Sequence, residues 1–362
     1  MKLELTGQED KLRARRVQLV EIQDGVILRR GRLQIKIEGE RAAEVVETIL
    51  RRAMEEEIDR TELVEIFAGP DRPAVSSLIQ KLESVNILVA AGKPAPSNPE
   101  SPLDIFYWHF GEQFEQVNNR QKQQQIAIIG VNYISRQLAH SLRTTGFANV
   151  GVVDYPLLSN LRLFEKNEQI PADWPVDLEL PLNYRDWLSE LDTANLDCLI
   201  ATSDVGGLQL MRSWNEFCVK YQKNFLPVVL QDLIGYLGPL VIPGETACFE
   251  CLRARQNAHF NDPVTRRAAE AVAFEGQAVT GFHPAMASVL ADLASIELSK
   301  FYGGWTSSRL PGRLIEVNLI APELTLHRVL KIPRCQVCSR LNSHSIVSVD
   351  RDTYLPLQEN RE

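Results

Sequence analysis

Four of the six cysteines in this chain stand in two Cys-x-x-Cys pairs, Cys248 with Cys251 and Cys335 with Cys338. Four thiolates on two short knuckles can close a tetrahedral shell around Zn²⁺, and an all-sulfur shell leaves no open position for water or substrate. We therefore predict a structural zinc site that ties the middle of the chain to its end. Disulfides or redox-active dithiols are the alternatives, and a metal assay on purified protein separates them because both predict no bound metal.

A second candidate site follows the apolar run at 126–130, which ends in Gly130 and precedes a helical pattern. The turn between such a strand and helix often binds nucleotide phosphates through backbone N–H groups and the positive helix end. In a G-x-G-x-x-G turn two more glycines leave room for the ligand, but Asn132 and Ser135 stand at those positions. Asp154, at the end of the next predicted strand, either accepts hydrogen bonds from a ribose or caps a helix.

The elements that position these residues alternate between strand and helix. The apolar patterns predict strands at 126–130, 149–154, 197–202 and 226–230, with helices at 133–146 and 208–221. This alternation predicts an α/β body with a mostly parallel, Rossmann-like sheet. Further strands at 239–242, 312–318 and 323–329 surround a long helix at 284–302, and a single helix is expected around 105–116.

The first ninety residues have a different pattern. They predict strands at 17–22, 25–30 and 32–38, followed by helices at 40–53, 60–67 and 74–85, which is a small α+β winged-helix pattern. Four prolines then discourage regular structure up to residue 104. The predicted organisation is a first domain at 1–92, a linker at 93–104, a second domain at 105–345 and a tail at 346–362.

Composition limits the class of protein. The 362 residues are 44% hydrophobic, enough for two cores, and carry a formal charge of −8 with an isoelectric point near 5.5. This balance argues against a nucleic-acid-binding surface, and we interpret the arginine-rich stretch at 13–16 as a solvated terminus. No apolar run is long enough for a membrane span, and the charged start is not a signal peptide, so we expect a cytoplasmic protein.

The order of several residues is similar to that of a known family. These are Gly130, Asp154, the segment Ser-Asn-Leu at 159–161, Asp204 and the segment Pro-Gly-Glu-Thr-Ala-Cys-Phe-Glu-Cys-Leu at 243–252. Over about 125–340 the chain resembles the ubiquitin-activating-enzyme-like, ThiF-type superfamily. The two cysteine pairs match the zinc site of that family.

The resemblance implies an adenylation fold in which ATP and Mg²⁺ activate a carboxyl group. Asp204 would then lie near the metal and phosphates as the candidate catalytic residue, and Asp154 near the ribose. Gly130 and Asn160 would complete the nucleotide site, and Arg162 would take the place of a phosphate-contacting arginine. Because two loop glycines are replaced, we expect phosphate binding to be weakened or lost.

A winged-helix module before a ThiF-like domain resembles maturation proteins for ribosomally made, modified peptides such as bacteriocins and other antibiotics. That resemblance implies a leader-peptide-recognition domain, in which the leader adds as a strand to the segment 32–38 and lies against the helix 74–85. The implied peptide-binding residues are Arg32, Leu33, Ile35, Ile37, Leu78, Lys81 and Leu82, and Arg30 could meet a leader carboxylate. Alternatively, Leu78 and Leu82 belong to a core stripe.

Two functions fit these expectations. The first is an adaptor that captures a precursor leader and presents the peptide to a YcaO-type cyclodehydratase, which consumes ATP and forms rings. The second is a stand-alone enzyme of the microcin C or pantocin type, which adenylates carboxyl or amide groups of its bound precursor. Activation of a sulfur-carrier protein is a third possibility, but it leaves the first domain without a role. The resemblance also implies a homodimer.

Overall fold

The structure is a computed structural model that describes residues 11–90, 102–109, 114–160, 174–175, 178–231, 233–259, 265, 281–304 and 308–339. The chain divides into two compact units, Met1–Asn119 and Arg120–Glu362. This division falls in sequence after the predicted linker at 93–104.

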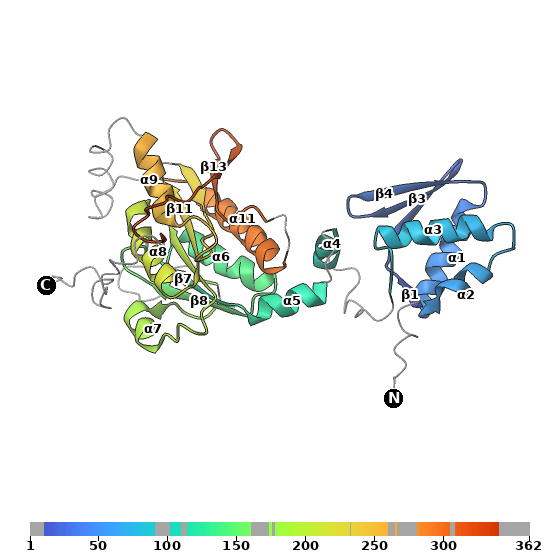
Figure 1. Cartoon of the computed structure of the whole chain (residues 1–362), viewed down its shortest axis with the longest axis horizontal. Coiled ribbons are helices and arrows are strands. Elements are labelled where there is room, and N and C mark those ends of the chain that lie inside the picture. The colour runs from blue at the N-terminus through green and yellow to red at the C-terminus, as the bar shows by residue number, and fades with distance from the viewer. Residues whose placement is uncertain are drawn as a thin grey trace. The chain divides into compact units, whose positions relative to one another are not determined.

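Up to residue 90, the described part of the amino-terminal unit contains two three-stranded antiparallel sheets and three helices (Figure 1). One sheet has the order β5-β1-β6, from Ile58–Asp59, Lys11–Ala14 and Leu88–Ala90. The other has the order β2-β3-β4, from Gln18–Ile22, Gly25–Arg30 and Leu33–Glu38. The helices are α1 Ala42–Glu55, α2 Arg60–Glu65 and α3 Arg72–Ser84. The three strands and three helices predicted here all form, while the winged-helix assignment stays a prediction.

The core of this unit follows from helical and strand periodicity. Val46, Ile49, Leu50 and Ala53 lie on one face of α1 and are buried against Leu28 and its neighbours. Asp59 caps α2 by accepting a hydrogen bond from the Thr61 N–H at 2.7 Å.

Helix α3 ends in a Schellman turn. Asn86 adopts a positive φ of 57°, its N–H donates to Glu83 O, and the Ile87 N–H donates to Leu82 O. The turn redirects the chain from α3 into β6.

Two expectations for this unit were wrong. The stretch at 13–16 is not a solvated terminus, because β1 is the central strand of its sheet and Leu12 and Ala14 are buried. The single helix expected around 105–116 is replaced by two helices, α4 Pro102–His109 and α5 Phe114–Gln123. Charged side chains on β1 hid the apolar alternation that its two buried residues follow.

The second unit is built on one eight-stranded sheet in the order β14-β13-β12-β11-β10-β7-β8-β9. The strands are β7 Gln125–Ile129, β8 Asn149–Asp154, β9 Leu182–Asn183, β10 Cys198–Ser203, β11 Asn224–Gln231, β12 Ile234–Leu237, β13 Arg313–Asn318 and β14 Glu323–Arg328. The five neighbouring strands β11, β10, β7, β8 and β9 pair in parallel, and β12, β13 and β14 pair in an antiparallel manner. The predicted mostly parallel α/β sheet is therefore confirmed, with β12 in place of the strand expected at 239–242.

Helices cover both faces of this sheet. Helices α6 Tyr133–Thr144 and α11 Pro284–Tyr302 lie side by side on one face (Figure 1). Helices α7 Tyr184–Glu190, α8 Met211–Lys220 and α9 Phe249–His259 contribute to the core of the other face. All six residues of β10 are buried, as expected for a central strand covered on both faces.

Among the described residues, no helix combines the length and the apolar character that a membrane span requires.

Candidate functional site

The four paired cysteines come together in the second unit. The Sγ atoms of Cys248 and Cys335 are 3.6 Å apart, those of Cys251 and Cys338 are 3.5 Å apart, and those of Cys248 and Cys251 are 3.8 Å apart. All four Sγ atoms lie within 4.8 Å of one another, and all four are free thiols. Zn–S bonds of about 2.3 Å in a tetrahedral shell place sulfur atoms about 3.8 Å apart. The donor set therefore fits a single four-coordinate metal ion.

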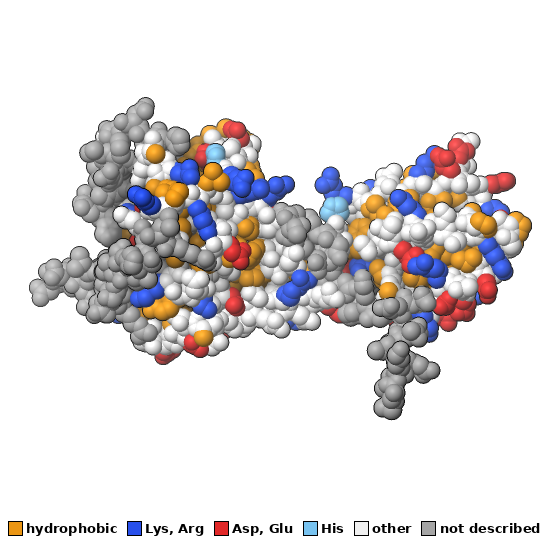
Figure 2. Space-filling model, in the orientation of Figure 1, with side chains coloured by type: hydrophobic (Ala, Val, Ile, Leu, Met, Phe, Trp, Pro, Cys, Tyr) orange, Lys and Arg blue, Asp and Glu red, His pale blue; other side chains and the backbone are white. Residues whose placement is uncertain are grey.

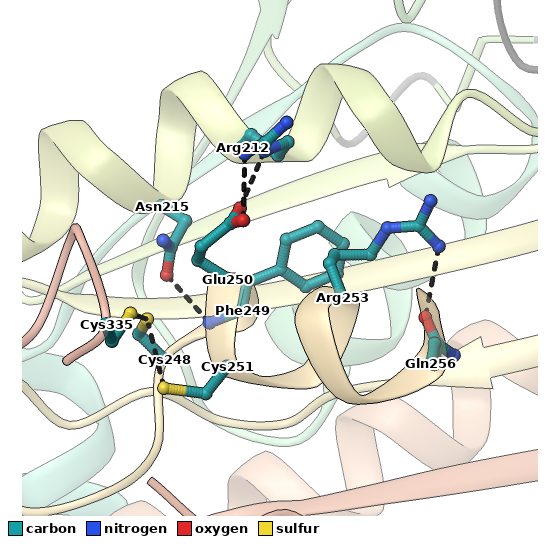
Figure 3. Close-up of polar contacts among 9 residues, drawn as sticks. All are labelled: Arg212, Asn215, Cys248, Phe249, Glu250, Cys251, Arg253, Gln256 and Cys335. Carbon is teal, nitrogen blue, oxygen red and sulfur yellow. Dashed lines mark hydrogen bonds and ion pairs between the residues drawn. The ribbon is translucent and has the colours of Figure 1, made fainter. Parts of the chain in front are cut away.

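The surroundings hold this cluster in place (Figure 3). Cys248 precedes α9 and Cys251 lies in its first turn, and the Phe249 N–H at the start of this helix donates to Asn215 Oδ1 of α8 at 2.9 Å. Figure 3 also shows the two hydrogen bonds, of 2.6 and 2.8 Å, by which Arg212 of α8 binds the Glu250 carboxylate. Helix α8 thus fixes the knuckle through one backbone and one charged contact.

Hydrogen bonds within the cluster lower the pKa of two of its thiols, Cys251 and Cys335. A hydrogen bond from the Cys248 thiol lowers the pKa of Cys251 to about 7, and the Ile332 N–H also donates to Cys251 Sγ at 3.4 Å. A metal ion binds the thiolate form of cysteine. The sequence-predicted set of four cysteines is therefore brought together as expected.

The turn between β7 and α6 is filled by the chain itself. All four backbone N–H groups from Gly130 to Tyr133 donate within the protein, and their acceptors are, in order, Val153 O at 2.9 Å, Ser159 Oγ at 3.0 Å, Ser135 Oγ at 2.9 Å and Asp204 Oδ2 at 2.8 Å. These are the groups that bind phosphate in a nucleotide-binding turn. In this structure their hydrogen-bonding capacity is already used.

Asn132 accounts for much of this filling. Its Oδ1 accepts from the Ser135 N–H at 3.0 Å and caps α6, while Ser135 Oγ returns the contact as a capping box. Its Nδ2 donates at 3.0 Å to Leu158 O and to both oxygens of Thr202. Asn132 has no exposed surface, so it binds the turn to its neighbours and does not face a ligand.

The backbone conformation and the close packing at position 130 require a glycine. Its φ is +99°, and a Cβ there would lie 2.8 Å from Leu158 Cβ, Leu158 O and Thr202 O. The close approach that this glycine permits is made by the protein chain.

The three polar residues expected at a nucleotide site do meet around this turn. Asp204 is 2% exposed, and its Oδ1 accepts from Asn160 Nδ2 at 3.0 Å while its Oδ2 accepts from the N-terminus of α6. Ser159 Oγ donates to Asp154 Oδ1 at 2.7 Å, which links Asp154 to the same network. The carboxylate of Asp204 therefore occupies the positive helix end at which a phosphate would bind. Arg162 lies outside the described residues.

Ser159 belongs to the sequence motif at 159–161, but no role was predicted for it. It accepts from the Val131 N–H and donates to Asp154, so it joins the β7–α6 turn to the end of β8. The sequence signal for this role is the presence of a hydroxyl side chain directly before Asn160.

In the amino-terminal unit, the predicted peptide-binding residues lie on β4 and α3. Leu33, Ile35 and Ile37 alternate along β4 as partly buried residues that pack on the core, and β4 pairs with β3 on one side only among the described strands. Figure 2 shows hydrophobic side chains at the surface of this unit among charged ones.

The other residues of this set differ in exposure. Leu78 is partly buried, Arg32 and Lys81 are exposed, and Leu82 is fully buried in the core. Arg30 is also buried and is paired with Asp104, so it cannot meet a leader carboxylate without leaving that partner.

Comparisons with known proteins locate the fold. No family model and no curated protein matches the sequence. Among solved structures, E. coli MccB with MccA-N7isoASN matches with a TM-score of 0.65 at 16% identity, covering 91% of this chain and 100% of MccB. E. coli MccB with ATP matches with a TM-score of 0.64, also at 16% identity, covering 91% of this chain and 99% of that chain.

The heterocyclase TruD matches with a TM-score of 0.60 at 18% identity, covering 97% of this chain but 45% of TruD. This chain therefore spans less than half of that larger protein. At these identities the comparisons establish architecture: the chain shares the fold of MccB over nearly its whole length and that of part of a heterocyclase.

Proposed function

We propose that this protein binds the leader of a ribosomally made precursor peptide and supports its ATP-dependent modification by a separate enzyme of the YcaO cyclodehydratase type. The observation that carries this proposal is the β7–α6 turn, where all four N–H groups and the helix end are occupied by the chain. Asn132 and Asp204 would both have to move before a phosphate could bind there.

One side of β4 is paired with no described strand, and this supports the peptide-binding half of the proposal. An extended peptide added to β4 would gain main-chain hydrogen bonds, and its side chains would meet Leu33, Ile35, Ile37 and Leu78. Arg32 and Lys81 would pair with acidic residues of the leader. Leu82, which has no exposed surface, would support this groove from the core.

Two solved structures support the peptide-binding part of the proposal. MccB was determined with MccA-N7isoASN, and a heterocyclase that this chain matches at a TM-score of 0.56, 16% identity and 40% of that chain was determined with substrate and cofactor. This chain matches 45% of TruD, and in this proposal a separate YcaO-type protein supplies the ring-forming activity. We place the process in the cytoplasm, where the precursor is made, and expect the protein to act as a homodimer.

We also assign zinc to the four-cysteine cluster. A closed sulfur shell would hold the segments around Cys248 and Cys335 together and would take no part in the reaction.

The test uses a precursor encoded beside this gene and the neighbouring YcaO-type enzyme. Calorimetric titration should show that the full-length protein binds the precursor, and ATP-dependent loss of water from the precursor should need both proteins. Modification of the precursor by this protein alone would overturn the adaptor role. Absence of precursor binding would overturn the whole proposal.

The second candidate is a stand-alone adenylating enzyme, and the full coverage of MccB favours it. Asp154, Asn160 and Asp204 are also within one network, as such a site would need. Asp204→Asn keeps an acceptor for the Tyr133 N–H while it removes the charge that would hold Mg²⁺. Precursor-dependent pyrophosphate release that is present in the wild type and lost in this variant would support the enzyme, and a wild type without release would exclude it.

A further inference from the structure

A buried charge cluster joins α4 to the sheets of the amino-terminal unit. Arg30, at the end of β3, donates from one terminal nitrogen to Arg16 O at 2.6 Å and from the other to Asp104 Oδ2 of α4 at 2.6 Å. Arg15 approaches Asp104 Oδ1 to 3.8 Å, which is an ion pair without a hydrogen bond. The cluster therefore bridges the segment after β1, strand β3 and helix α4.

This cluster is not neutral. Two guanidinium groups share one carboxylate, and Asp104 and Arg30 are only 1% and 5% exposed. Burial lowers the pKa of both Arg15 and Arg30, which Asp104 partly opposes. Among the described residues, Arg15 Nε and Nη1 and Arg30 Nε have no hydrogen-bond partner. Buried charge in excess and unsatisfied donors both weaken the docked state.

The docking contact also includes Trp108, which is 6% exposed and packs in the hydrophobic core of this unit. Trp108 donates from Nε1 to Asn86 O at the end of α3, and the Arg30 guanidinium lies 5.0 Å from the centre of its indole ring. At the β3–β4 turn, a Cβ on Gly31 would lie 3.1 Å from Ile105 of α4. Helix α4 has only eight residues, and a helix of that length is marginal without tertiary contacts.

The contact of α4 with the amino-terminal unit limits the length of chain that connects the two units. The segment between α4 and α5 is 110–113, and α5 continues past Asn119 into the second unit. Four residues span at most about 14 Å. With α4 released, the connection would run from residue 91 to residue 113 and could extend to about 80 Å.

We propose that Arg15, Arg30 and Asp104 form an ionic latch that holds α4 on the amino-terminal unit and so sets the distance over which this unit can move relative to the second unit. The proposal rests on the proposed function for its purpose, since a peptide held on β4 is delivered within that distance. Tether length sets the local concentration of a linked group, so opening the latch would change presentation without altering the β4 groove.

Hydrogen exchange of the free full-length protein tests the latch. Asp104→Asn leaves two buried cations without a counter-charge, so amides of α4 should exchange at least about tenfold faster while those of α1 stay protected. Arg15→Met removes the excess charge and should slow α4 exchange by about threefold. Asp71→Asn, which breaks an exposed ion pair with Arg41 in the same unit, should change neither.

Opposite effects of the two variants are the signature of the latch. Small-angle scattering should also show a larger radius of gyration for Asp104→Asn. If both substitutions speed exchange, or if α4 and α1 exchange together in every variant, α4 is a fixed part of the core and the latch is rejected. Should Asp104→Asn fail to fold, Arg15→Met alone decides by the sign of its effect. No peptide is present, so these outcomes are independent of leader binding.

Discussion

At the scale of single residues, Asn132 shows how a nucleotide-binding turn can become a structural one. Its side chain caps α6 and donates hydrogen bonds to the buried carbonyl groups of Leu158 and Thr202. A glycine at this position could do neither. The same residue therefore excludes a ligand and stabilises the fold.

Replacing Asn132 by alanine should lower the free energy of unfolding by about 2–4 kcal/mol, because a helix cap and several buried hydrogen bonds are lost. Urea denaturation monitored by circular dichroism measures this loss. Asn149→Ala is the control, since Asn149 makes an exposed contact to Lys122 O. Equal stabilities of the two variants would contradict the role given to Asn132.

Glu216 on α8 gives a prediction that depends on pH. Burial raises the pKa of this carboxyl, Arg212 lowers it and Glu250 raises it again. A group whose pKa is raised on folding stabilises the protein at low pH, and this contribution is lost as the pH rises from the unfolded-state value through the folded-state value.

Glu216→Gln should therefore raise the melting temperature at pH 7 relative to wild type, and the difference should shrink as the pH falls toward about 4. Melting curves over this pH range test it. A stabilisation that does not change with pH would point to packing instead of charge.

The sequence predicted some residue roles well and others not at all. The four cysteines could be assigned because metal-ligand spacing is local and chemically specific. The pairing of Arg30 with Asp104 joins positions 74 apart, and nothing local marks either residue as buried. Gln121 is similar: it looks like part of a polar run, yet it is buried and donates to Ser299 O.

At the scale of elements, β4 carries the peptide-binding prediction. Ile35 points toward the core side of this strand, where a peptide side chain would lie, and Gln34 points to the other face. Ile35→Arg should weaken precursor binding by at least about tenfold, whereas Gln34→Arg should leave it within about threefold. Calorimetric titration checks both variants. If both weaken binding equally, the leader does not use this face.

The hydrophobic periodicity of the sequence predicted which segments form helices and strands. It did not predict which strands pair with one another. The strong patterns of α6, α8 and α11 predicted helices at nearly the observed positions. The order of strands in the eight-stranded sheet, with β10 between β7 and β11, depends on contacts far apart in sequence. For the same reason β1 was missed, since its partners β5 and β6 come more than forty residues later.

At the scale of the whole molecule, the two units have separate cores, and the cysteine cluster lies entirely in the second. Differential scanning calorimetry should therefore resolve two transitions. A zinc chelator should lower the melting temperature of one by about 5 °C or more and leave the other unchanged.

Cys335→Ser should reproduce the effect of the chelator, whereas the Cys218→Ser variant should still respond to the chelator, because Cys218 is not one of the four clustered thiols. Metal analysis should find one zinc per chain in the Cys218 variant and less in the Cys335 variant. A single transition, or loss of both transitions with chelator, would show that the units do not unfold independently.

The long separation between the two cysteine pairs also bears on how the protein is made. Cys248 and Cys335 are 87 positions apart, and strands β13 and β14 lie between them in sequence. A ribosome must therefore translate past Cys338 before the metal shell can close, whereas the described strands of the first unit have been synthesised long before. A nascent chain could thus display a finished leader-binding surface while its larger body is still being synthesised.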